Sequence, residues 1–125
     1  MKVYLAGPMR GYPRYNFDAF DDYARRLRAF DIEVVSPADL DRDRGFDPDK
    51  DEFTHDMQIQ AMAIDLDEIS RCDTLVLMPG SEKSTGAKVE SAYARYLGIP
   101  VIGVERFIRD RNLPVRDGDV PAVPA

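Results

Sequence analysis

The sequence predicts a single domain of the α/β class, a three-layer sandwich in which helices cover both faces of a parallel sheet of four to five strands. Three observations predict it. The chain has 125 residues, the length of one domain. Short apolar runs alternate along it with longer amphipathic segments. Pro and Gly stand at the ends of these runs, where a strand gives way to a turn.

The first strand is expected at residues 2–6, a short apolar run that Gly7 and Pro8 bring to an end. A turn-rich loop follows, and then a helix to about residue 30, with Asn16 or Asp18 as its cap. Its apolar residues recur at helical spacing with charges between them, which predicts a surface helix: Phe17, Phe20, Ala24, Leu27 and Phe30.

Two segments of contrasting character come next. Residues 32–37, IEVVSP, predict a second short strand that ends at proline. Residues 39–52, DLDRDRGFDPDKDE, are charged and rich in turn-forming residues. Such a stretch is long for a connection within a compact domain. We therefore interpret it as a mobile excursion and a candidate lid.

The second half of the chain repeats the alternation of helix and strand. A helix is expected over residues 53–71, and a nearly all-apolar third strand over 73–78, as in a strand covered on both faces. Another helix should span residues 85–97. Gly98 then occupies the position of a left-handed cap, and Pro100 prevents the helix from continuing.

The C-terminal part carries weaker signals. IPVIGV, residues 99–104, predicts a fourth strand, and residues 106–112 predict a short helix. The domain is therefore expected to span residues 1–112. Residues 113–125 are rich in Pro and Ala and are expected to form a loose tail.

Composition and charge exclude several classes of function. The net charge of −6 argues against a nucleic acid polymer as partner. The single cysteine, Cys72, excludes an internal disulfide and a cysteine metal cluster, and fits a reducing cytoplasm. No signal peptide is expected, because the N-terminus enters a strand-like run at once. No apolar run approaches the ~20 residues of a membrane span. Residues 39–52 fail the EF-hand pattern.

The turn at residues 79–86 is the first candidate site. Strands that alternate with helices predict a parallel sheet, in which ligands bind beyond the carboxyl ends of the strands. This turn and the loop at residues 7–13 both fall at that edge. The turn opens onto a helix N-terminus, where free N–H groups favour an anion. Ser84 and Gly86 would form this phosphate cradle, although a plain helix cap is an equally good interpretation of Ser84.

Three further side chains are candidates at the same edge. Glu90 lies one to two turns into the helix and can lean back toward the cradle. Asp65 lies in the last turns of the preceding helix, and Tyr4 lies at the end of the first strand. Arg10 in the first loop could pair with a phosphate. Taken alone, Glu90, Asp65 and Arg10 are each more often ordinary solvated side chains. The only histidine is His55, and no serine has the context of a nucleophile elbow, so a Ser-His-Asp triad is not expected.

These pieces together resemble the nucleoside 2-deoxyribosyltransferase superfamily. The resemblance rests on VYLAGPMRG, on IDLDEISRCDTLVLM and on STGAKVESAYARYLGIPVI, and it covers about residues 2–104. The chain looks closest to the short branch of 2'-deoxynucleoside 5'-monophosphate N-glycosidases, with small phage and bacterial members. The resemblance implies a flavodoxin-like, Rossmann-like domain that usually forms a homodimer, with active sites near the subunit interface.

The resemblance also implies roles for individual residues. Glu90 matches the catalytic glutamate, Asp65 the second acid and Tyr4 the strand tyrosine. Phosphate and sugar contacts match Gly7, Pro8, Met9, Arg10, Gly11, Ser84 and Gly86. Gly7-Pro8 is nearer the transferase version of the first loop than the glycosidase version, and no match is found beyond Glu105.

The predicted activity is cleavage of the N-glycosidic bond of a nucleoside 5'-monophosphate, deoxyribose or ribose, through Glu90 as nucleophile. No metal or other cofactor is needed. Deoxyribosyl transfer between bases, phosphoribohydrolysis of the cytokinin-activating type, and a non-catalytic nucleotide sensor or partner protein remain open alternatives. A helix over residues 53–71 with apolar residues on more than one face favours a homodimer.

Overall fold

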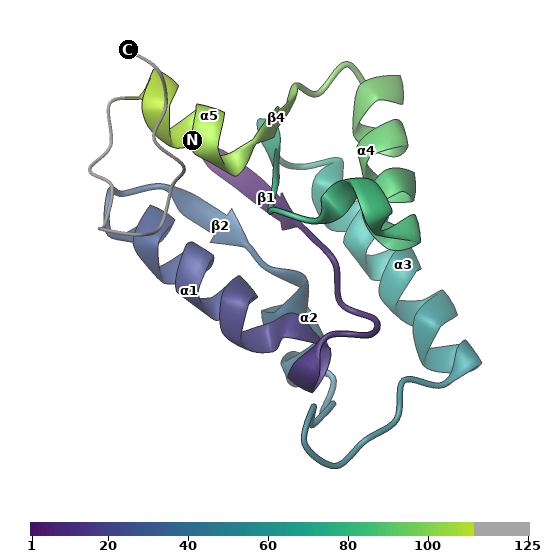
Figure 1. The fold of residues 1–125 in the computed structure, drawn as a ribbon. Helices are drawn as coiled ribbons and strands as arrows, with labels where there is room; N and C mark the ends of the chain where they lie inside the picture. Colours follow the sequence, from purple (N-terminus) through teal and green to yellow (C-terminus); the bar gives the residue numbers. More distant parts are fainter. Residues whose placement is uncertain (112–125) are drawn as a thin grey trace.

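The computed structural model describes residues 1–111 and shows an α/β fold (Figure 1). The predicted loose tail at 113–125 lies outside the described residues. The elements follow in the order β1 Lys2–Ala6, η1 Pro13–Asn16, α1 Phe17–Arg28, β2 Glu33–Val35, α2 Pro37–Asp43, α3 His55–Ile69, β3 Thr74–Leu77, η2 Ser81–Lys83, α4 Thr85–Tyr96, β4 Val101–Gly103 and α5 Val104–Asp110. Within these residues no helix is long and apolar enough to cross a bilayer.

The sheet has four parallel strands in the order β2-β1-β3-β4. The central strand β1 pairs with β2 on one side, where Tyr4 lies opposite Val35, and with β3 on the other, where Tyr4 lies opposite Leu75. Because all strands are parallel, their carboxyl ends share one edge. The α/β class and the four-stranded parallel sheet are therefore as predicted.

Helices cover both faces of the sheet and make the three layers (Figure 1). Side chains of β1 alternate between the faces. Val3 and Leu5 pack in one core with residues of α1 and α5. Tyr4 and Ala6 pack in the other core with residues of α3 and α4. This alternation places the fully buried Tyr4 side chain against α4, the helix that carries Glu90.

Helix α1 shows how the pattern of the sequence fixes an element. Its buried residues are Phe17, Phe20, Ala24 and Leu27, a single stripe at helical spacing. Arg25, Arg26 and Arg28 lie in its last turn, where positive charge is favourable. Asn16 occupies the N-cap position, but its side chain donates to the Pro8 carbonyl at 2.9 Å instead of capping the helix. The cap thus ties α1 to the first loop.

The interpretation of residues 39–52 as a mobile excursion is wrong. Their first part belongs to helix α2, which begins at Pro37, a residue whose fixed φ suits the first helical position. Arg42 pairs with Asp21 of α1 at 2.5 Å and Asp39 pairs with Arg28 of α1 at 2.9 Å, so charges of this segment are partnered by α1. Phe46 is buried in the core shared with α1. The segment is therefore a packed part of the domain.

Candidate active site

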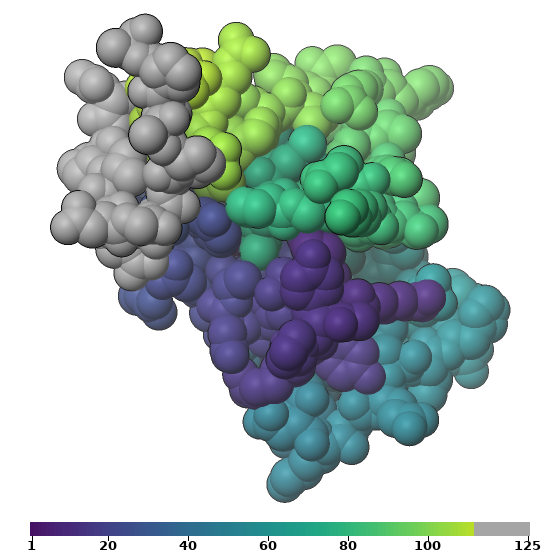
Figure 2. Space-filling view, in the orientation of Figure 1, coloured from purple at the N-terminus to yellow at the C-terminus, as the bar shows by residue number. Residues whose placement is uncertain are grey.

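A cavity of about 800 Å³ opens at the carboxyl edge of the sheet. Its wall comes from the loop after β1, the turn after β3, and helices α2, α3 and α4. The loop after β1 and the turn after β3 touch each other. A Cβ placed on Gly80 of the turn would lie 2.9 Å from the Tyr12 hydroxyl and 3.2 Å from the Pro8 ring, both in the loop. Figure 2 shows this loop, in purple, against the green turn at the molecular surface. The two predicted segments therefore meet at one site.

Glu90 lies in the wall of this cavity and is 5% exposed. Ala87, Glu90, Ser91 and Ala94 are the residues that α4 buries against the sheet. The Tyr4 hydroxyl donates a 2.6 Å hydrogen bond to Glu90 Oε2. Tyr4 lies in the middle of β1 rather than at its end, and it lies behind Glu90 instead of lining the cavity. It holds the carboxylate from the core side.

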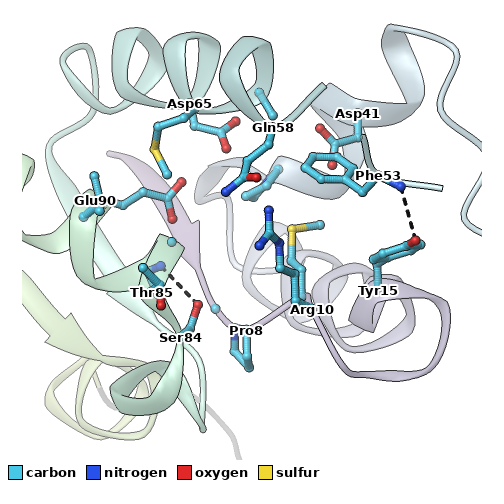
Figure 3. Close-up of a pocket in the computed structure, with 18 of the residues that line it drawn as sticks. Pro8, Arg10, Tyr15, Asp41, Phe53, Gln58, Asp65, Ser84, Thr85 and Glu90 are labelled. Atoms are coloured by element: carbon cyan, nitrogen blue, oxygen red, sulfur yellow. Dashed lines mark hydrogen bonds between the residues drawn. The ribbon is translucent and has the colours of Figure 1, made fainter. Parts of the chain in front are cut away.

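Asp65 lies on α3 and also lines the cavity. The buried residues of this helix are Ala61, Asp65 and Ile69, which recur every fourth position and face the sheet. The side chain of Asp65 is 7% exposed, and its Oδ1 has no hydrogen-bond partner among the described residues. A buried oxygen without a partner is costly unless a proton or a ligand satisfies it. Figure 3 shows Asp65 across the pocket from Ser84.

Burial and mutual repulsion set the protonation of this pair. Burial raises the pKa of Asp65 to about 7, with the nearby charge of Asp41 as a second cause. Burial first and the Asp65 charge second raise the pKa of Glu90 well above its ordinary value, while the Tyr4 hydrogen bond lowers it. The Tyr4 pKa is itself raised by burial and by Glu90, so this phenol stays protonated and remains a donor. The arrangement favours one shared proton, with Tyr4 directing the negative charge to Glu90.

The N-terminus of α4 forms another side of the cavity. Ser84 Oγ accepts a 3.1 Å hydrogen bond from the Ala87 N–H, so the cap interpretation of Ser84 is confirmed. Ser84 and Gly86 also line the cavity, together with Lys83 and Thr85. A Cβ on Gly86 would come no closer than 3.9 Å to its neighbours. The glycine is therefore not required by packing, and the space beside it is open to a ligand.

The first loop contributes most of its predicted residues. Gly7, Pro8, Met9 and Arg10 line the cavity, and Figure 3 shows Pro8 and Arg10 on the side opposite α3. A Cβ on Gly7 would meet the Met78 sulfur at 2.9 Å, so only glycine fits there without a shift. Gly11 does not line the cavity and instead shapes the loop through its positive φ of 81°.

Several residues of the cavity were not predicted from the sequence. Asp41 of α2 lines it, although it is only 1% exposed, and Arg44 Nη2 donates to its Oδ1 at 2.8 Å. Three aromatic rings that also line the cavity pack edge-on or tilted against one another: Tyr15, Phe46 and Phe53. Their spacing in the chain has no periodicity that would reveal them. Lys83 could have been predicted as a cavity residue, because it directly precedes Ser84 of the predicted cradle.

Residues 1–111 contain no group of three or more His, Cys, Asp or Glu side chains arranged to hold a metal ion. His55 is exposed and lines the cavity. The chain's own residues offer three buried carboxyl groups at the cavity, one phenol behind it and a helix N-terminus. Such a set can carry nucleophilic and acid–base steps on a ligand whose anionic end binds at the helix.

Comparisons with known proteins agree with this architecture. A solved structure of a 2-deoxyribosyltransferase from the psychrotolerant bacterium Bacillus psychrosaccharolyticus has the same fold, with a TM-score of 0.60 and 24% sequence identity over 82% of this chain and 71% of that chain. No curated protein matches the chain. The family model of a domain of unknown function, DUF4406, matches residues 1–103, nearly the whole of the described fold. The chain therefore belongs to the DUF4406 family.

Proposed function

We propose that the protein cleaves the N-glycosidic bond of a nucleoside 5'-monophosphate, releasing the free base and the sugar phosphate. One observation carries the proposal: the buried Glu90 carboxylate, held by Tyr4 at 2.6 Å, lines a ligand-sized cavity that it shares with Asp65 and the N-terminus of α4. Cavities of roughly 300–1,000 Å³ are typical of small-molecule sites. The 2-deoxyribosyltransferase that shares the fold makes sugar–base chemistry a reasonable expectation for this site.

The proposed reaction begins with attack of a Glu90 oxygen on the anomeric carbon. The bond between this carbon and the base nitrogen breaks, and its electron pair stays on the base. Asp65 donates its proton to the departing base, for which a pKa of about 7 suits it at neutral pH. The transition state resembles an oxocarbenium ion, which the negative charge of Glu90 stabilises. The product of this half-reaction is a glycosyl ester of Glu90.

Water completes the proposed hydrolysis. Asp65, now ionised, accepts a proton from a water molecule that attacks the anomeric carbon and releases Glu90. The 5'-phosphate would bind where Ser84, Thr85 and Gly86 begin α4, with Lys83 and Arg10 as nearby cations. Tyr4 is a positioning residue, because it contacts Glu90 and not the cavity.

Deoxyribosyl transfer is the second candidate, favoured by the fold shared with the 2-deoxyribosyltransferase. It uses the same first half-reaction and replaces water by an incoming base. Adding a second base to the assay separates the two activities. Appearance of a new nucleotide carrying that base indicates transfer, whereas free sugar phosphate indicates hydrolysis.

Incubation with a panel of nucleosides and nucleoside 5'-monophosphates, followed by chromatography of the released base, tests the proposal. Glu90→Gln keeps the size of the side chain and removes the nucleophile, so base release should fall at least about 10³-fold. Glu82→Gln is the matched control, since Glu82 is exposed in the turn before α4, and it should release base like the wild type. The proposal is wrong if no substrate releases base, or if Glu90→Gln releases it at the wild-type rate.

A further inference from the structure

Asp41 is a buried carboxylate that the proposed reaction does not use. It lies on α2, which directly follows β2, and its side chain is 2% exposed. Arg44, one turn further along, donates to Oδ1 at 2.8 Å from the more exposed side. No residue from 1 to 111 donates a hydrogen bond to the second carboxylate oxygen, Oδ2. Oδ2 is also not one of the fully enclosed oxygens that lack a partner, which are Ser36 Oγ and Asp65 Oδ1. Within residues 1–111 it is therefore an acceptor without a hydrogen-bond partner on a residue that lines the cavity, and Figure 3 shows the Asp41 side chain at the pocket.

The sheet sets where Asp41 lies relative to Glu90. The strand order is β2-β1-β3-β4, so the helix after β2 and the helix after β3 begin two strand positions apart. Neighbouring strands are roughly 4.8 Å apart, which makes this separation about 10 Å. Figure 3 shows Asp41 beside Phe53 on one side of the pocket and Glu90 on the other, with Asp65 between them. The order across the cavity is thus Ser84, Glu90, Asp65 and Asp41.

This order matches the order of groups in a nucleotide. With the phosphate at Ser84 and the anomeric carbon at Glu90, the glycosidic nitrogen lies toward Asp65, and the base extends toward Asp41. Tyr15, Phe46 and Phe53 line that end and offer aromatic surface to a flat ring. The edge of the base farthest from the glycosidic nitrogen would reach Asp41.

We propose that Asp41 is a specificity-determining residue that accepts a hydrogen bond from an exocyclic amino group on the far edge of the substrate's base. This inference rests on the proposed function for the position of the sugar. In adenine and cytosine that edge carries an amino group, and in hypoxanthine, thymine and uracil it carries an oxo group. A carboxylate oxygen attracts an N–H donor and repels the lone pairs of an oxo group. The substrate class is therefore a nucleotide with an aminated base.

The first experiment needs no variant of the protein. It compares matched pairs that differ only in the amino group: the 2'-deoxyribonucleoside monophosphates of adenine and purine, and those of cytosine and pyrimidin-2-one. A lost hydrogen bond to a charged group corresponds to roughly a 10- to 100-fold change. For whichever pair the protein cleaves, we expect kcat/KM to be about 10- to 100-fold higher for the nucleotide that carries the amino group. Equal kcat/KM within a pair overturns the inference while leaving the proposed function intact.

The second experiment separates specificity from a structural role of Asp41. Asp41→Asn should reduce the preference for the aminated member toward unity, because an amide no longer presents a charged acceptor. A purely structural defect would lower kcat/KM for both members equally and leave their ratio unchanged, which contradicts the inference. Asp43→Asn, an exposed position on the same helix, is the matched control and should keep the wild-type ratio.

Binding measurements distinguish failure of this inference from failure of the proposed function. Isothermal titration of the wild type and of Asp41→Asn with adenine, purine and hypoxanthine reports the preference without turnover. If no nucleotide is cleaved but adenine binds about 10-fold or more tightly than purine, only in the presence of Asp41, the inference stands and the glycosidase proposal fails. If purine and adenine bind equally, Asp41 does not recognise the base.

Discussion

The Tyr4 hydroxyl donates a 2.6 Å hydrogen bond to Glu90 Oε2, joining two residues that are 86 positions apart in the chain. The bond links the central strand of the sheet to α4, and both side chains are buried. A phenol whose pKa is raised cannot give up its proton to the carboxylate, so it acts as a fixed donor. The bond is thus a built-in stabiliser of negative charge at Glu90.

Tyr4→Phe tests this role. The ring keeps its place in the core, but Glu90 loses the donor that lowers its pKa. We expect the acid limb of the pH profile of kcat/KM to move to higher pH, and kcat at pH 7 to fall about 10- to 100-fold. Tyr96→Phe is the control and should leave the profile unchanged, because Tyr96 is 85% exposed at the end of α4, the helix that carries Glu90. An unshifted acid limb in Tyr4→Phe would show that Tyr4 only fills space.

The pH dependence of stability tests the environment of Asp65. Its pKa rises from 3.8 to about 7 on folding, so the folded state binds the proton more tightly than the unfolded chain. The contribution to stability is fully present below pH 3.8 and is lost as the pH rises to about 7. Each pKa unit corresponds to about 1.4 kcal/mol. Asp65→Asn has no charge to bury and should escape this loss.

Urea denaturation at several pH values measures the difference. At pH 8 we expect Asp65→Asn to be more stable than the wild type by on the order of 4 kcal/mol, because the pKa of Asp65 rises from 3.8 to about 7 on folding. Glu90 also ionises more easily once the Asp65 charge is gone, which adds to the difference. The gap should shrink toward pH 4. Asp67→Asn, an exposed position on the same helix, serves as control with little pH-dependent change. A constant gap at all pH values would contradict a shifted pKa at Asp65.

Gly86→Ala tests the anion cradle. A methyl group fits the folded chain, with its nearest neighbour at 3.9 Å, and alanine favours the helix by roughly 0.5–1 kcal/mol over glycine. The same methyl group would stand where a phosphate approaches the first turn of α4. We expect the variant to be at least as stable as the wild type. Its KM for the nucleotide should rise about tenfold, which corresponds to the loss of about one hydrogen bond to a charged group.

Gly103→Ala is the control for this substitution. Its φ of −64° suits any residue, and nothing lies within 4 Å of the added Cβ. Because glycine is a better N-cap than alanine, the variant should lose some stability, but it should keep the wild-type KM. An unchanged KM in Gly86→Ala, measured on a substrate that Glu90 cleaves, would place the phosphate elsewhere.

The oligomeric state is a further prediction. Ile59 of α3 is 56% exposed and Val89 of α4 is 43% exposed, and both line the cavity. We propose that a second copy of the chain covers this rim and completes the site. Light scattering should report a dimer at micromolar concentration. Ile59→Lys should shift it toward monomer and reduce activity, whereas Gln60→Lys on the same helix should do less. A monomeric wild type with full activity would contradict the proposal.

The sequence by itself determined the class of fold and most of its elements. The apolar run of β1, the stripe of α1 and the left-handed Gly98 after α4, with φ 77°, were all readable because each depends on neighbours close in the chain. The parallel sheet followed from their alternation. Ser84 and Glu90 were predicted because they lie within one turn-and-helix unit, whose geometry a short segment dictates.

Only the tertiary structure decided what local signals do not contain. Residues 39–52 look like a loop in sequence, because their charges and turn-formers hide the few residues that anchor them. Their order comes from Arg42 pairing with Asp21 and from Phe46 packing in the core, contacts with partners far along the chain. The same distant packing buries Asp41 in the cavity wall and joins Tyr4 to Glu90. Burial and pairing between remote segments are properties of the folded chain, so the periodicity of any one segment does not predict them.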